Sequence, residues 1–286
     1  MPLAHQSSTP WWRAVVLGLA LLVACDDTST APDGGQPGRT DVLAHLVVTG
    51  NPEAAQGASF TYRDTVDGVV YDLTGVLLKP TGQGPFPGVI VSHGFGGTAA
   101  GYSRSVGTRI VPWGVVVIAV NYTHAVGVPL GAPGTQSELG ASAANVRRAR
   151  RAAAILGALG YVDTTRLAAH GHSMGAFVTA GLAAAHPALL RAASHTAGGV
   201  RVDFPTGAAP TETEARSIRT PYQLHHGDHD AVVVLAADQR LATVLAGEGT
   251  PHELHVYGGV DHNGVAFDAA MLERVRTWYG RHGVLR

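Results

Sequence analysis

Short apolar runs recur along this chain, and each is followed by a longer segment of mixed character. The run 115–120 reads V-V-V-I-A-V and is the plainest strand of the sequence. The run 88–92 predicts a second buried strand, because it is short, apolar and bounded by turn residues. By the same pattern we expect strands at 42–48, 59–63, 70–78, 166–170, 192–195, 222–226 and 253–257.

Helices are predicted between most of these strands. Their expected ranges are 104–111, 138–159, 176–186, 235–246 and 265–281. Alternating strands and helices predict an α/β fold with a mostly parallel central sheet and helices on both of its faces. The first three strands follow one another without a helix, which favours an antiparallel edge. The sequence has no internal repeat and no second linker.

The N-terminal segment has the pattern of a targeting signal. Residues 14–24 are apolar behind Arg13, but a helix needs about 20 apolar residues to cross a bilayer. The run ends in L-V-A-C, which resembles the bacterial lipobox, and this resemblance implies a lipid on Cys25. We therefore expect a signal peptide at 1–24, a flexible tether at 25–40 and a folded domain at 41–286.

Anchoring through Cys25 would place the protein in a bacterial cell envelope, in contact with the membrane. Cys25 is the only cysteine, so it has no partner for an intramolecular disulfide. The alternative is a soluble secreted protein that is cleaved near the same position.

Composition and charge indicate a folded protein with a sizeable core and give no sign of a nucleic-acid partner. The chain has 286 residues, of which 45% are hydrophobic, and this is enough for one large core or two small ones. Its net charge is −1, so no global field favours nucleic acid, and we expect no nucleic-acid partner. Four arginines of the 138–159 helix are expected on its solvated face: Arg147, Arg148, Arg150 and Arg151.

Residues 171–175 read G-H-S-M-G and carry the most specific signal in the chain. A predicted strand precedes this G-x-S-x-G pattern and an alanine-rich helix follows it, which is the context of a nucleophile elbow. The two glycines leave room for a tight turn that holds Ser173 in strained geometry with its hydroxyl exposed. The alternative is an ordinary serine in a glycine-rich turn.

A serine hydroxyl needs a base to accept its proton, and the base needs an acid to orient it. The run 225–230, H-H-G-D-H-D, follows a predicted strand and resembles the H-G-x-x-D motif of the α/β-hydrolase superfamily. This resemblance implies that Asp230 is the acid, with Asp228 as the competitor. It also implies that His262, in the small-residue loop after the last strand, is the base.

The loop 92–97, S-H-G-F-G-G, resembles the oxyanion loop of the same superfamily. The resemblance implies that the backbone N–H groups of Phe95 and Met174 stabilise the oxyanion, each by about 3 kcal/mol. The ring of Phe95 is expected to contact the substrate, and His93 is expected to brace the loop.

The resemblance covers about residues 60–286 and is strongest to dienelactone hydrolase-like and bacterial cutinase-like esterases. Two departures stand out. Dienelactone hydrolase itself uses a cysteine nucleophile, whereas this chain has Ser173. Cutinase-like enzymes often carry a disulfide, and a chain with one cysteine cannot form one within itself.

Only residues 197–220 separate two predicted strands at the position where many relatives insert a cap. This segment is too short for a large cap domain, so we expect an open cleft with walls at 200–219 and 123–136. Tyr122 is a candidate substrate-binding wall residue, with a place in the core as the alternative.

These features predict a serine esterase that acts on a small-molecule or polymeric ester without a metal or other cofactor. One alternative is amide or peptide hydrolysis by the same residues, and a second is a surface binding protein on an inactive scaffold. A third is metal-dependent hydrolysis at His225, His226, Asp228 and His229. Alternation along the strand places neighbouring residues of that cluster on opposite faces, which disfavours a metal site.

Overall fold

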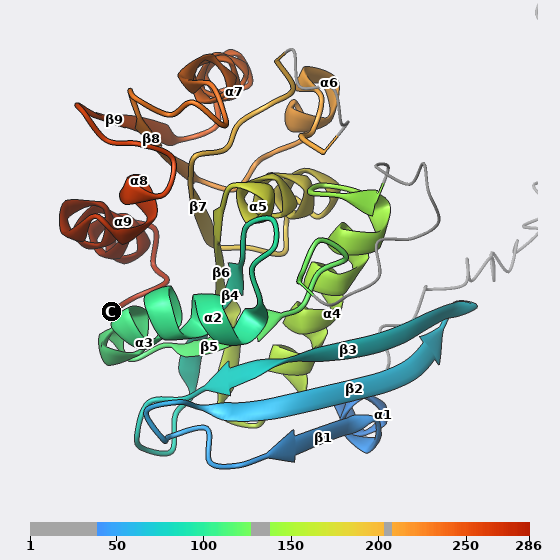
Figure 1. The fold of residues 1–286 in the computed structure, drawn as a ribbon. Coiled ribbons are helices and arrows are strands. Elements are labelled where there is room, and N and C mark those ends of the chain that lie inside the picture. The colour runs from blue at the N-terminus through green and yellow to red at the C-terminus, as the bar shows by residue number, and fades with distance from the viewer. Residues whose placement is uncertain (1–38, 127–137, 203–207) are drawn as a thin grey trace, which may run out of the picture. The chain divides into compact units, whose positions relative to one another are not determined.

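The computed structural model describes residues 39–126, 138–202 and 208–286 (Figure 1). The chain divides into two units, Met1–Gln36 and Pro37–Arg286, and the described residues belong to the second. The predicted signal peptide, Cys25 and the tether up to residue 38 lie outside the described residues and stay predictions. Helix α1 (Arg39–Ala44) already begins within the range predicted as tether. None of the described helices has both the length and the apolar character that a membrane crossing requires.

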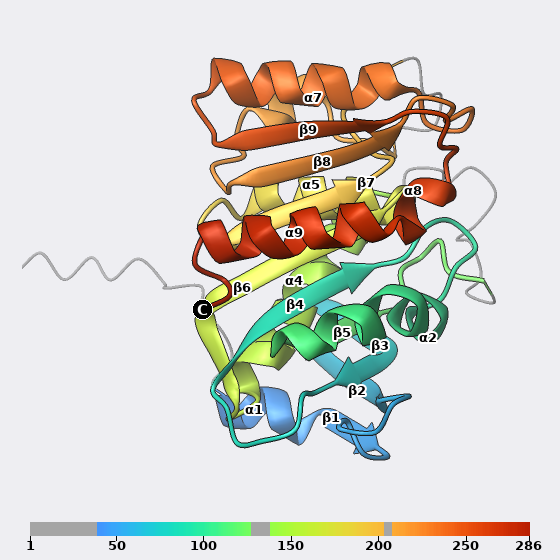
Figure 2. The same ribbon diagram turned by 90° about the vertical axis from the view of Figure 1, so that its left-hand side faces the viewer.

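The described residues form one nine-stranded mixed sheet (Figures 1 and 2), and Figure 2 shows β6, β7, β8 and β9 side by side. Its strand order is β1-β2-β3-β5-β4-β6-β7-β8-β9. The first three strands and the β3–β5 pair are antiparallel, and every later pair is parallel, as the sequence predicted. The strands are β1 (Leu46–Thr49), β2 (Ala58–Val66), β3 (Val69–Leu78), β4 (Phe86–Ser92), β5 (Val116–Val120), β6 (Val162–His172), β7 (Ala192–Thr196), β8 (Tyr222–Gly227) and β9 (His252–Tyr257).

Helices cover both faces of the sheet, and each face has its own apolar core (Figure 2). One face carries α1, α4 (Ala143–Ala158), α5 (Met174–Ala185), α6 (Glu212–Ala215) and α7 (Leu235–Gly247). The other carries α2 (Ala99–Tyr102), α3 (Thr108–Ile110), α8 (Gly264–Phe267) and α9 (Ala269–Arg281). Strand β5 is apolar throughout because its odd-numbered residues pack into one core and its even-numbered residues into the other.

Two predicted elements differ from the structure near the N-terminus. The predicted strand 42–48 is instead α1 followed by the short β1, because Val42 packs as a helical residue into the core beside α4. The predicted helix 104–111 begins earlier, at α2, where the Thr98 hydroxyl accepts the amide of Gly101. It continues as a π-helical turn (Ser103–Gly107), then α3 and a 3-10 turn (Val111–Trp113).

Capping side chains shorten two further helices. Helix α4 begins at Ala143 rather than near 138. Ser142 is its N-cap, because the Ser142 hydroxyl accepts a hydrogen bond from the backbone amide of Asn145. The predicted helix 265–281 is divided at Asp268, whose carboxylate accepts the amide of Met271 and starts α9.

Arg151 corrects the prediction of a fully solvated arginine face on α4. Its side chain is buried, with 7% of its surface exposed. The guanidinium lies 5.7 Å from the ring centroid of Tyr62 and 4.9 Å from that of Tyr71. The two rings, supplied by β2 and β3, shelter the guanidinium through cation–π contact, which the sequence of α4 alone does not reveal.

Candidate active site

Ser173 occupies a sharp turn between β6 and α5. Its backbone has φ 57° and ψ −121°, a conformation that a non-glycine residue rarely adopts. The flanking glycines are required by space: a Cβ on Gly171 would overlap the carbonyl of Gly175, and one on Gly175 would overlap the carbonyl of Ser92. The amide of Ser173 donates to the Thr196 carbonyl over 3.0 Å, so β7 holds the turn in place.

We expect Gly175→Ala to destabilise the fold by roughly 3 kcal/mol, because the new methyl group must displace the backbone of β4. Urea unfolding measures the change. Gly280→Ala on α9 is the matched control: a Cβ there meets nothing within 4 Å, so it should stabilise the helix by about 1 kcal/mol. Equal unfolding midpoints for wild type and Gly175→Ala would contradict the close packing of the turn.

The side chains of Ser173, His262 and Asp230 form one hydrogen-bonded chain. The Ser173 Oγ lies 2.9 Å from Nε2 of His262. Nδ1 of His262 lies 2.7 Å from Oδ2 of Asp230. The carboxylate accepts a hydrogen bond from the Nδ1–H group, which leaves Nε2 unprotonated and able to accept the hydroxyl proton of Ser173. The three residues follow β6, β9 and β8, whose carboxyl ends meet at one edge of the parallel sheet.

Asp230, and not its competitor Asp228, contacts the histidine. Oδ1 of Asp230 accepts the amides of Val232 and Val233 over 2.8 and 2.9 Å. Burial favours the neutral form, but hydrogen bonds from His226, His262 and these amides outweigh it and hold the pKa of Asp230 well below its usual range. Asp228 is exposed and instead accepts the amide of Gly259.

The loop after β4 lies directly beside the serine. A Cβ on Gly94 would be 3.3 Å from the Cβ of Ser173. The ring of His93 supports the loop through two hydrogen bonds. Its Nδ1–H donates to the Gly94 carbonyl, and its Nε2 accepts a hydrogen bond from the backbone amide of Tyr122. Burial lowers the pKa of His93 to about 4, so the ring is neutral at physiological pH. Phe95 is 60% exposed on this loop, and Met174 directly follows the serine.

Two further histidines of this region were not singled out by the sequence. His124 follows β5, and its Nε2 donates to the His93 carbonyl over 3.1 Å. His172 precedes the serine, and its ring centroid lies 4.9 Å from that of His262. Burial lowers the pKa of His172 to about 4, with the charge of His262 acting in the same direction. His172 occupies a variable position of the G-x-S-x-G pattern, and His124 lies outside the motifs, so the sequence assigned neither residue a role.

Tyr122 requires a correction. Its side chain has no exposed surface and its hydroxyl lies 2.8 Å from the Ser92 hydroxyl, so it belongs to the core and not to a cleft wall. Of the predicted wall segments 123–136 and 200–219, residues 127–136 and 203–207 lie outside the described residues. Between β7 and β8 the described part contains only the short α6 and no large cap.

The histidines of the proposed metal alternative point to different partners. Nδ1 of His225 lies 2.8 Å from the Tyr257 hydroxyl, whereas Nδ1 of His226 lies 2.7 Å from Oδ2 of Asp238. Within the part of the chain that the structure describes, no three histidine, cysteine or acidic side chains are grouped to hold a metal ion.

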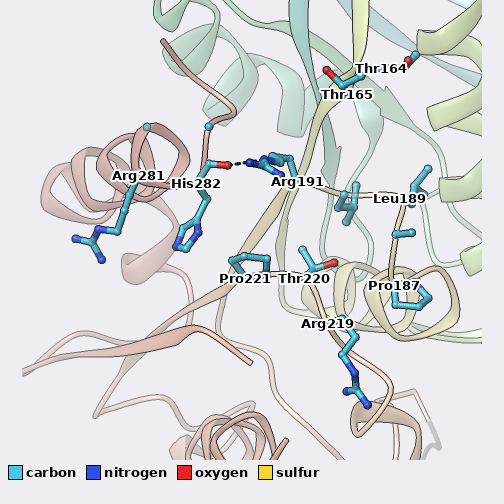
Figure 3. A pocket seen from close by; sticks show the side chains of 14 residues that line it. Thr164, Thr165, Pro187, Leu189, Arg191, Arg219, Thr220, Pro221, Arg281 and His282 are labelled. Carbon is cyan, nitrogen blue, oxygen red and sulfur yellow. Dashed lines mark hydrogen bonds between the residues drawn. The ribbon is translucent and has the colours of Figure 1, made fainter. Parts of the chain in front are cut away.

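A pocket of about 610 Å³ lies at the opposite edge of the sheet (Figure 3). Its side chains come from the amino ends of β6, β7 and β8 and from the end of α9. Figure 3 shows the Arg191 side chain donating to the His282 carbonyl across it. Arg219, the last residue of the predicted wall segment 200–219, lines this pocket, but none of the predicted catalytic, oxyanion or substrate-binding residues does.

The fold and the serine turn define an α/β hydrolase. The sequence model of the dienelactone hydrolase family matches residues 73–272, and the chain belongs to that family. No curated protein sequence gives a significant match to the chain. The resemblance to cutinase-like enzymes stays a prediction.

Solved structures share this fold at low sequence identity. The S-formylglutathione hydrolase from Agrobacterium tumefaciens superposes with TM-score 0.64 and 15% identity, covering 82% of this chain and 99% of that one. A cold-adapted esterase from an Arctic intertidal metagenomic library gives 0.62 and 19%, with coverages of 80% and 94%. A puromycin-hydrolyzing peptidase from Mycobacterium tuberculosis gives 0.61 and 20%, with 83% of this chain but only 46% of the peptidase covered. The chain therefore spans less than half the length of that peptidase.

Proposed function

We propose that this protein hydrolyses carboxylic esters through a Ser173–His262–Asp230 triad and an acyl-enzyme intermediate. The observation that carries the proposal is the unbroken hydrogen-bonded chain from the strained serine to a buried carboxylate. Membership of a hydrolase family and the esterase neighbours that the chain spans almost completely support the same reaction class.

The reaction runs in two halves. His262 takes the hydroxyl proton as Ser173 Oγ attacks the ester carbonyl, and the oxygen that becomes negative is stabilised by the amides of Phe95 and Met174. His262 then gives that proton to the leaving alcohol, and the acyl group stays on Ser173. Water attacks the acyl-enzyme with His262 as base, which releases the carboxylic acid and restores the hydroxyl. Asp230 stabilises the imidazolium in both halves.

A substrate panel tests the proposal and its main rival. We expect the wild-type protein to hydrolyse p-nitrophenyl acetate and butyrate, and a serine-directed fluorophosphonate to label Ser173. Peptide p-nitroanilides measured in parallel separate esterase from peptidase: faster turnover of the peptides would overturn ester hydrolysis as the main activity. A protein that neither turns over esters nor takes the label would support a binding protein on an inactive scaffold.

A further inference from the structure

A second buried chain of ionisable groups continues behind Asp230. His226 on β8 contacts Asp238 on α7, with 2.7 Å between Nδ1 and Oδ2. The other oxygen of Asp238 lies 2.6 Å from Nε2 of His195 on β7. The side chains of His195, His226, Asp230 and Asp238 are all 0% exposed. These contacts connect β7, β8 and α7 directly behind the proposed catalytic acid.

The contacts of His226 define its charge. Nε2 lies 2.8 Å from the Val233 carbonyl and 3.3 Å from Oδ2 of Asp230, and both of these groups accept hydrogen bonds. Nδ1 faces the carboxylate of Asp238, which also accepts when it is ionised. A neutral imidazole has only one N–H, so this environment requires the doubly protonated imidazolium. Burial favours the neutral ring, but hydrogen bonds to Asp230 and Asp238 raise the pKa of His226 to about 10.

Asp238 is not required by the packing of α7. Its neighbours on the buried face are apolar, among them Ala237, Leu241 and Leu245. Burying a carboxylate there costs free energy, and replacing a buried ion pair by apolar side chains is often neutral or stabilising. Asp238 links α7 to β7 through His195 and to β8 through His226, and its contact with His226 also connects it to the proposed catalytic acid.

We propose that His226, held as a cation by Asp238, is a positioning residue for Asp230. This inference rests on the proposed function and deepens it. His226 fixes Oδ2 of Asp230 at the point where His262 meets it, while the Val232 and Val233 amides fix the other oxygen. The cation also offsets part of the negative field that Asp230 exerts on His262. Asp238 lies on the far side of His226, so its own charge acts on His262 more weakly.

The charged and titratable groups that face His226 come from β7, β8, the loop after β8, and α7. Tyr222 and Asp230 belong to β8 and the loop after it, Asp238 to α7 and His195 to β7. Nδ1 of His195 lies 3.0 Å from the Tyr222 hydroxyl and its Nε2 lies 2.6 Å from Oδ1 of Asp238. Beyond Asp230 lie the rings of His262 and His172. Replacing His226 and Asp238 together removes one positive and one negative charge, so the net charge of the protein stays the same.

The double variant His226→Gln/Asp238→Asn tests the proposal in the full-length protein. It removes both charges and retains polar side chains of similar size. We expect kcat/KM for p-nitrophenyl butyrate to fall roughly tenfold as Asp230 loses its fixed orientation. We expect the acidic limb of the kcat/KM profile to move to higher pH by roughly half a unit, because the nearer charge that is removed is the positive one.

His225→Gln is the matched control. His225 is the neighbouring residue on β8 and equally buried, but it contacts Tyr257 and Gln223 on the other face. Its loss should change stability and leave the acidic limb in place. An unmoved limb in an active double variant would overturn the positioning role, whereas a wild type without ester activity would overturn the proposed function.

A measurement on the wild-type protein does not depend on how the variants fold. Nitrogen-15 NMR of the imidazole rings at mildly alkaline pH should show both nitrogens of His226 protonated, while buried His225 stays neutral because desolvation lowers its pKa. A neutral His226 ring under these conditions would overturn the inference whether or not the protein hydrolyses esters.

Discussion

Ser173→Ala should reduce kcat for p-nitrophenyl esters by about a million-fold, as expected when the nucleophile of a triad is removed. The methyl group cannot attack the carbonyl, so no acyl-enzyme forms. The turn itself should survive, since the amide of residue 173 still donates to the Thr196 carbonyl. Ester turnover and thermal unfolding of the same preparation separate a loss of chemistry from a loss of fold.

The control for this result is Ser217→Ala. Ser217 is an exposed serine after α6 and lies outside the candidate site. We expect it to turn over esters and take the fluorophosphonate label like wild type, while Ser173→Ala takes no label. Equal turnover by wild type and Ser173→Ala would eliminate Ser173 as the nucleophile.

Asp230→Asn should lower kcat by about 10⁴-fold with little change in the fold. The structure gives a specific reason for so large an effect. The amides of Val232 and Val233 lie 2.8 and 2.9 Å from one oxygen position, closer than His226 lies to the other, so we expect the asparagine carbonyl at the first position and the NH₂ group facing His262. That NH₂ donates to Nδ1, which forces the ring proton onto Nε2. His262 can then no longer accept the proton of Ser173.

Asp228→Asn is the counterpart that distinguishes the two acids of the H-G-D-H-D run. Asp228 is exposed and accepts the Gly259 amide, a bond that the asparagine oxygen can also accept. Its ester turnover should stay close to wild type. If Asp228→Asn loses activity and Asp230→Asn retains it, the acid has been assigned to the wrong residue.

The sequence predicted the fold well where periodicity and chain order decide the outcome. Strand β5 shows why: a strand covered on both faces must be apolar at every position, and this run is short and rich in β-branched valine and isoleucine, which favours a strand over a buried helix. The range 42–48 was predicted as a strand because its β-branched residues favour one. The packing of Val42 beside α4 overrides this local preference and makes the first part a helix.

The candidate site could be predicted because each residue lies in a turn or loop after a strand, within a segment that resembles an α/β-hydrolase motif: Ser173 immediately after β6, Asp230 in the loop after β8 and His262 in the loop after β9. Tyr122 also follows a strand, but it continues the two-residue alternation of Val116 and Val120 into the core. The contact between His226 and Asp238 had no sequence signal. It depends on how α7 is rotated against the sheet, and no linear pattern specifies that rotation.

The proposed catalytic residues are anchored unevenly in the sheet. Ser173 follows β6, which is paired on both sides, whereas His262 follows β9, a half-exposed strand paired on one side only. Local opening at an edge requires less free energy than global unfolding. Transient fraying of β9 would therefore withdraw the base while the nucleophile stays in place. As temperature or denaturant concentration rises, we expect activity to be lost before the core unfolds. Stabilising β9 should therefore raise the temperature and the denaturant concentration at which activity is lost.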